Sequence, residues 1–130
     1  MRKTSYPRLE VLRELDRLTS GISPNRFIST RPPATAEPMQ DFLLIRLPQT
    51  IYDRGDTYQS TVGQIAVFAR DIQGGLEDTL RLEHMQQAVT ALFPVAAETF
   101  HAARPLVLPG GSDGAGFHSL IIQFRITIFK

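Results

Sequence analysis

The sequence contains no cysteine, shows almost no charge imbalance and has no long hydrophobic run. Without cysteine, the chain has no disulfide and no thiolate chemistry. The 14 basic and 13 acidic residues leave a formal net charge of +1, which gives no overall attraction to nucleic acid or to an anionic membrane. The apolar runs are far shorter than a membrane span, and the charged start, MRKTSYPRLEVLRELDR, has no apolar core of a signal peptide. We therefore expect a cytoplasmic protein without a membrane partner.

The sequence does contain enough apolar material for one compact domain. Its 130 residues are 42% hydrophobic, which is sufficient for a core and is not typical of a disordered chain. We find no internal repeat and no long low-complexity tract. Residues 1–130 are therefore expected to form a single domain.

Two segments have the spacing of amphipathic helices. In residues 6–20 apolar side chains recur every three or four positions, with charged residues on the opposite side. In residues 76–93 a second apolar stripe follows the pair Gly74-Gly75 and ends before Pro94. Both segments predict a helix with one face directed at a core.

The remaining apolar segments predict β-strands at residues 26–30, 41–47, 58–70, 99–108 and 117–129. In the last of these, apolar and polar residues alternate, which is typical of an antiparallel strand with one buried face. The order α-β-β-β-α-β-β predicts a two-layer α+β domain, in which both helices cover one face of a mostly antiparallel sheet of four to five strands. We expect one core to contain Leu12, Leu15, Val67, Val89, Leu92, Ile122, Phe124 and Ile126.

One segment matches a catalytic motif by its letters alone. Residues 110–114 read Gly-Gly-Ser-Asp-Gly, which fits the G-x-S-x-G nucleophile elbow of hydrolases. In that motif a helix must follow the serine. Here a strand is expected to follow, so we predict that Ser112, Asp113 and His118 form no catalytic group. The same loop lacks the Lys-Ser/Thr pair of a phosphate-binding loop.

The other candidates for chemistry are weak. The three histidines His84, His101 and His118 have no metal-ligand spacing, and the acidic residues are explained by helix capping and solvation. Basic residues of the first helix alternate with acidic ones, which favours pairs on a solvated face over a nucleic-acid surface. We therefore expect no enzymatic activity, no cofactor, no metal and no sequence-specific nucleic-acid partner.

The predicted sheet face without helices carries more apolar residues than a monomer needs. The run FLLIRL, within residues 41–47, is apolar on both faces except at Arg46, which predicts a strand covered on both sides or packed against another subunit. The candidate assembly residues are two apolar side chains of the last strand and a mixed-charge turn, namely Ile121, Phe129, Tyr52, Asp53, Arg54 and Asp56. We expect them to mediate self-association into a closed ring.

The order of these segments resembles that of the tail-terminator and tail-completion (minor tail) proteins of tailed phages. The similar stretches are the first helix LEVLRELDRLTSGI, the crossover FISTRPPATAEP, the strands DFLLIRL and IAVFARD, and the final strand FHSLIIQFRITIF. The resemblance implies a ring-forming subunit, usually a hexamer, that caps the tail tube and meets the neck proteins. It also implies a phage or prophage gene and a location in the host cytoplasm and the virion tail.

The sequence thus leaves two functions open. One is a structural tail-assembly subunit, and the other is a small non-catalytic α+β binding or adaptor domain with a cellular role.

Overall fold

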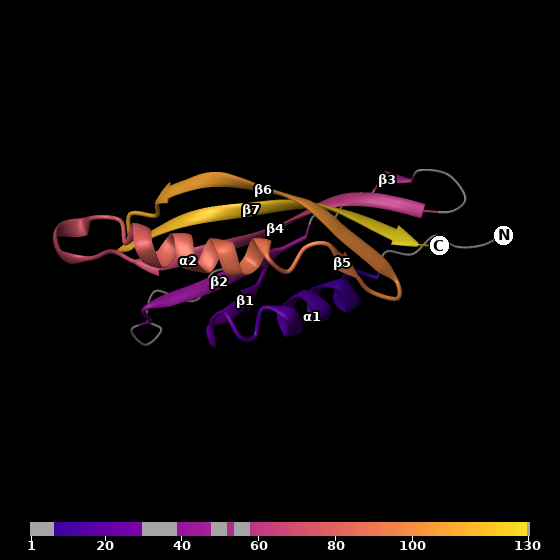
Figure 1. Ribbon diagram of the computed structural model, residues 1–130, viewed down its shortest axis with the longest axis horizontal. Helices are drawn as coiled ribbons and strands as arrows, with labels where there is room; N and C mark the ends of the chain where they lie inside the picture. The colour runs from indigo at the N-terminus through magenta and orange to yellow at the C-terminus, as the bar shows by residue number, and fades with distance from the viewer. Residues whose placement is uncertain (1–6, 30–38, 48–51, 54–57, 130) are drawn as a thin grey trace.

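A computed structural model describes residues 7–29, 39–47, 52–53 and 58–129 of the chain. They form an α+β domain with two helices and a single sheet, which confirms the predicted fold class (Figure 1). The elements follow one another in this order: α1 (Arg8–Leu18), β1 (Arg26–Ile28), β2 (Asp41–Arg46), β3 (Tyr52–Asp53), β4 (Tyr58–Arg70), the 3₁₀ turn η1 (Gln73–Gly75), α2 (Thr79–Thr90), β5 (Val95–Ala96), β6 (Phe100–Ser112) and β7 (Phe117–Phe129).

The sheet is larger than the sequence predicts. It has seven strands in the order β1-β2-β4-β7-β6-β5, with β3 paired to β4, so the expected count of four to five is wrong. The two additional strands, β3 and β5, are two residues long and are too short to show an alternating pattern. The sheet is also mixed, because β1 pairs with β2 in parallel while the other pairs are antiparallel.

The main hydrophobic core lies between the helices and the sheet. Apolar residues of α1 and α2 belong to one buried cluster with the inward residues of β2, β4, β6 and β7. The helix α1 contacts β2, whereas α2 contacts β4 and β7. Seven of the eight predicted core residues are buried here. The exception is Leu92, which is only half-buried because α2 ends at Thr90 and Leu92 lies in the turn that follows.

A second, smaller cluster lies on the other face of the sheet. It contains Phe42, Leu44, Ala66, Phe68 and Phe117. The rings of Phe42 and Phe68 stack with centroids 4.3 Å apart. Because β2 contributes to both clusters, its two apolar faces are buried by residues of the same chain. The strand FLLIRL therefore needs no second subunit to cover it.

Glycine and proline set two boundaries that the sequence predicts imperfectly. The helix α2 begins at Thr79, three residues later than expected, because Gly74 and Gly75 take positive φ angles and the side chain of Asp78 caps the helix by accepting from the backbone N–H of Arg81. The strand β6 continues through Pro109 to Ser112, within the expected glycine loop. Register shifts in its pairing with β7 occur at both of its prolines.

Candidate functional site: exposed apolar surfaces on the sheet and at its end

The predicted assembly residues are distributed over two regions. Tyr52 and Asp53 form β3, whose backbone pairs with Ser60 and Gln59 of β4, while Arg54 and Asp56 lie outside the described residues. Ile121 is half-buried and packs against the second cluster. Phe129 is 44% exposed, and its ring lies edge-to-face with that of His101, with the ring centroids 5.0 Å apart. Among the four candidates that lie in the described residues, Phe129 is thus the one whose apolar side chain the structure shows to be exposed.

Polar and apolar side chains lie next to each other in the central part of the sheet face opposite the helices, which we call the helix-free face. In the paired strands β2, β4, β7 and β6, one row of neighbours runs Arg46, Gln64, Gln123 and Leu106. The Gln64 amide donates to the Gln123 side-chain carbonyl at 3.1 Å, which ties β4 to β7 on this face. In the next row, Val62 pairs with Arg125, and both side chains are exposed.

A small hollow lies beside these residues. It has a volume of about 180 Å³ and is lined by Val62, Arg104, Leu106, Gln123, Phe124 and Arg125. We call these six residues the hollow. Of its apolar members, Val62 and Leu106 are exposed, whereas Phe124 is buried in the main core. Among the described residues, neither Arg104 nor Arg125 takes part in an ion pair, so the hollow has a positive border.

The backbone of Arg104 contributes to the shape of this hollow. Its φ angle is +59°, in the left-handed region that a non-glycine residue rarely adopts. The residue lies in a register irregularity between Ala103 and Leu106, where β6 has one extra residue relative to β7. Such bulges bend a strand and redirect side chains. The bulge thus accounts for the presence of both Arg104 and Leu106 at one hollow.

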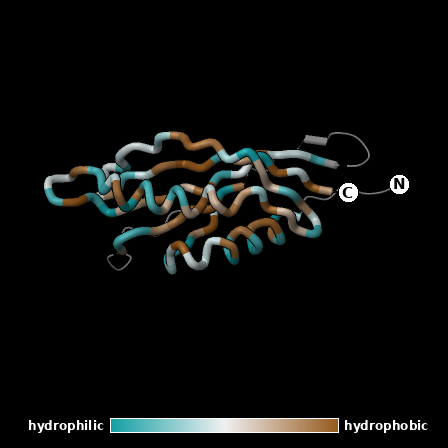
Figure 2. Tube along the Cα trace, in the orientation of Figure 1, coloured by the Kyte–Doolittle hydropathy of each residue, from teal (hydrophilic) through white to brown (hydrophobic). Residues whose placement is uncertain are grey.

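A second exposed apolar surface lies at the end of the sheet, where β4 leads into α2. We call Ile72, Leu76 and Leu80 the tip. All three are exposed, Leu76 by 63% and Leu80 by 80%. Figure 1 shows that the loop between β4 and α2 lies at one end of the long axis of the molecule, and Figure 2 shows hydrophobic segments within it. Exposed apolar residues that gather at a projecting loop are typical of contact sites.

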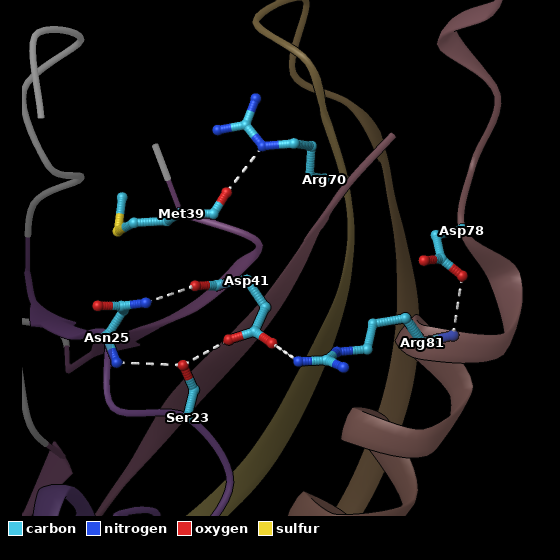
Figure 3. Close-up of polar contacts among 7 residues, drawn as sticks. All are labelled: Ser23, Asn25, Met39, Asp41, Arg70, Asp78 and Arg81. Carbon is cyan, nitrogen blue, oxygen red and sulfur yellow. Dashed lines mark hydrogen bonds and ion pairs between the residues drawn. The ribbon is translucent and has the colours of Figure 1, made fainter. Parts of the chain in front are cut away.

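The position of α2 behind this tip is fixed by a buried carboxylate. Asp41, at the start of β2, accepts a hydrogen bond from the Ser23 hydroxyl at 2.7 Å and forms an ion pair with Arg81 of α2 (Figure 3). The Asn25 side chain donates to the backbone carbonyl of Asp41 at 3.1 Å. One residue therefore connects the segment after α1, the strand β2 and the helix α2. The sequence contained a signal for this role, an acidic residue next to a buried apolar strand, but the prediction treated Asp41 only as a strand start.

The base of the tip loop is held by a histidine–aspartate pair. Asp71 follows β4, and one of its carboxylate oxygens lies 2.5 Å from Nδ1 of His118 on β7. The backbone N–H of Asp71 also donates to the carbonyl of Gly116 at 2.8 Å. These contacts join the end of β4 to the start of β7, at the point where the loop that carries the tip begins.

The same histidine lies opposite Ser112, the serine of the G-x-S-x-G sequence. Ser112 and His118 are paired across β6 and β7, and His118 is oriented by Asp71, which the sequence prediction did not include. Among the described residues, however, the Ser112 hydroxyl has one hydrogen-bond partner, the N–H of Gly114, and none from His118. Asp113 accepts from the N–H groups of Ala115 and Phe117 within its own turn. The serine is thus occupied by the turn, and no nucleophile–base hydrogen bond is present in this part of the structure.

Other chemistry finds little support in the described ranges. They contain no group of three or more histidine or acidic side chains that could hold a metal ion, and no helix in them is long and apolar enough to cross a membrane. A larger pocket of about 530 Å³ lies along α2, and its described lining residues all come from that helix and its cap, between Asp78 and Gln87.

No protein-family model matches this chain, and no curated protein sequence matches it either.

Proposed function

We propose that this protein is a non-catalytic structural subunit that assembles with copies of itself. The observation that carries the proposal is the pair of exposed apolar surfaces, the hollow on the helix-free sheet face and the tip at the end of the sheet. A monomer tolerates scattered apolar residues, but grouped ones on rigid elements are typical of protein contacts. The hollow is built on long strands, and the tip lies on the short loop that leads into α2 and on the first turn of that helix, which the buried network holds in place.

The order of elements supports a role in phage or prophage tails. A tail-terminator or tail-completion subunit must form a ring on the tail tube, and such a ring requires two different surfaces on each copy. Its partners would be other copies of the chain, in a ring such as a hexamer, and the tail tube and neck proteins. In this role the protein acts without enzymatic activity, cofactor or sequence-specific nucleic-acid binding, in the host cytoplasm and the virion tail.

The test is the mass of the protein in solution as its concentration rises. Light scattering should show wild-type association that increases with concentration, and electron microscopy should show whether the assemblies are closed rings. Val62→Lys places a charge at the centre of the helix-free face beside Arg125 and should abolish association. Leu9→Lys is the matched control, because Leu9 is also an exposed apolar residue but belongs to α1.

We prefer Val62 to Ile121 for this test. Ile121 packs against the second cluster, so a lysine there would disturb folding as well as any contact. A wild-type protein that stays monomeric at every concentration would contradict self-assembly. It would favour the second function, a small binding or adaptor domain.

A further inference from the structure

We propose that the tip of one copy binds in the hollow of a second copy. Each subunit then offers two different surfaces, one to each neighbour. This inference rests on the proposed self-assembly and specifies the contact that produces it.

The two surfaces lie too far apart to meet within one chain. The strand β4 carries Val62 of the hollow and ends at Arg70, just before the tip loop. Eight residues of strand separate these positions, which corresponds to about 26 Å at the rise of a β-strand. A second molecule is therefore needed to bring a tip to a hollow.

The sizes of the two surfaces agree. A cavity of about 150 Å³ lined by apolar side chains holds a molecule of the size of benzene. The hollow, at about 180 Å³, has room for one side chain such as Leu76 or Ile72. These two residues lie opposite each other in an antiparallel bridge, and the N–H of Ile72 donates to the carbonyl of Leu76 at 2.9 Å. Their side chains therefore leave the loop on the same side.

The charges of the two surfaces are opposite. Arg104 and Arg125 border the hollow, and neither is paired within the described residues. Glu77 and Asp78 lie between Leu76 and Leu80 of the tip, and Glu77 is exposed. Charged groups around an apolar contact select the partner and fix its orientation. A second copy of this chain supplies the matching acidic residues at the required place.

Both surfaces are held in shape before they meet. The tip loop is attached at its base by the Asp71–His118 pair and at its far end by the Asp41–Arg81 pair. The hollow is shaped by the bulge at Arg104 and by the Gln64–Gln123 hydrogen bond. A contact between pre-ordered surfaces loses less conformational entropy than one between flexible segments. The strained backbone at Arg104 is of the kind found at functional sites.

A contact between two different surfaces predicts a specific result when defective variants are mixed. Leu76→Asp destroys the tip but leaves the hollow intact, and Leu106→Asp destroys the hollow but leaves the tip intact. Both residues are exposed, so neither change affects the core. The two proteins are examined by sedimentation velocity, alone and as an equimolar mixture, with Leu9→Asp as the control for an added charge at another exposed leucine.

We expect each variant alone to lose association, with a dissociation constant raised roughly tenfold or more. The mixture should contain a one-to-one heterodimer and nothing larger, because it has one functional tip–hollow contact. Leu9→Asp should assemble as the wild type does. If the wild type associates but the mixture forms no heterodimer, this contact is wrong while self-assembly stands. If the wild type never associates, both proposals fail. Circular dichroism of each variant confirms that it is folded.

Discussion

At the scale of single residues, the two faces of β7 give the clearest contrast between core and surface. Phe124 is 1% exposed and lies in the main core, where the centroids of its ring and the Phe93 ring are 4.8 Å apart. Phe129, on the other face of the same strand, is 44% exposed. The same type of side chain on the same strand therefore belongs to the core at one position and to the surface at the other.

We expect Phe124→Ala to lower the free energy of unfolding by about 3–5 kcal/mol, because it removes a buried ring and leaves a cavity. Urea unfolding followed by circular dichroism measures the change in midpoint. Phe129→Ala is the matched control and should cost much less, since its ring is already partly hydrated. Equal losses in the two variants would contradict the assignment of the two faces.

At the scale of elements, the helix α2 is held to the sheet by packing and by one ion pair. Asp41 is buried, whereas its partner Arg81 is half-exposed. The two members of the pair are therefore not equivalent. Removal of Arg81 leaves a buried carboxylate with the Ser23 hydroxyl as its remaining side-chain donor, while removal of the charge at Asp41 leaves an arginine that water can solvate.

The difference between these two changes can be measured. Arg81→Met should lower the free energy of unfolding by about 1–3 kcal/mol, the cost of a buried polar group that loses its partner. Asp41→Asn keeps an acceptor for Ser23 and should cost about 1 kcal/mol or less. Arg17→Met, which breaks the exposed pair with Glu14 on α1, should change stability little. If Asp41→Asn is the more harmful change, the burial of this carboxylate is not what makes the pair important.

At the scale of the whole molecule, the proposed contact combines an apolar centre with opposite charges at its border. Salt should therefore weaken the assembly without abolishing it. From about 0.1 M to about 1 M salt the Debye length falls from about 10 Å to about 3 Å, so the attraction between the arginines and the acidic tip is screened.

We expect the dissociation constant of wild-type assembly to rise over this range of salt, as measured by sedimentation velocity. The double variant Arg104→Gln and Arg125→Gln should associate more weakly at low salt and should show a much smaller salt dependence. Assembly that grows stronger with salt in both proteins would indicate a contact that does not use these charges.

The sequence alone determined the elements whose pattern is long enough to be read. The strands at 58–70 and 117–129 were predicted with the bounds that the structure gives. The second shows a clear period of two, and the first is a long segment rich in β-branched, aromatic and small apolar residues. The two helices followed from apolar residues at helical spacing, and seven of the eight predicted residues of the main core followed from that spacing together with the strand patterns. The sequence also predicted that a strand follows Ser112 in place of the helix that a nucleophile elbow requires, and the structure has β7 there.

Only the tertiary structure decided which distant residues meet. The parallel pairing of β1, the short strands β3 and β5, and the bulge at Arg104 depend on neighbours in the sheet and have no local pattern. The same holds for the Asp41–Arg81 and Asp71–His118 pairs, whose members lie 40 and 47 residues apart. The hollow combines residues of three strands, and the tip is exposed because no other element covers that end of α2 in the described structure. Periodicity shows which side of an element is apolar, but packing decides whether that side is buried.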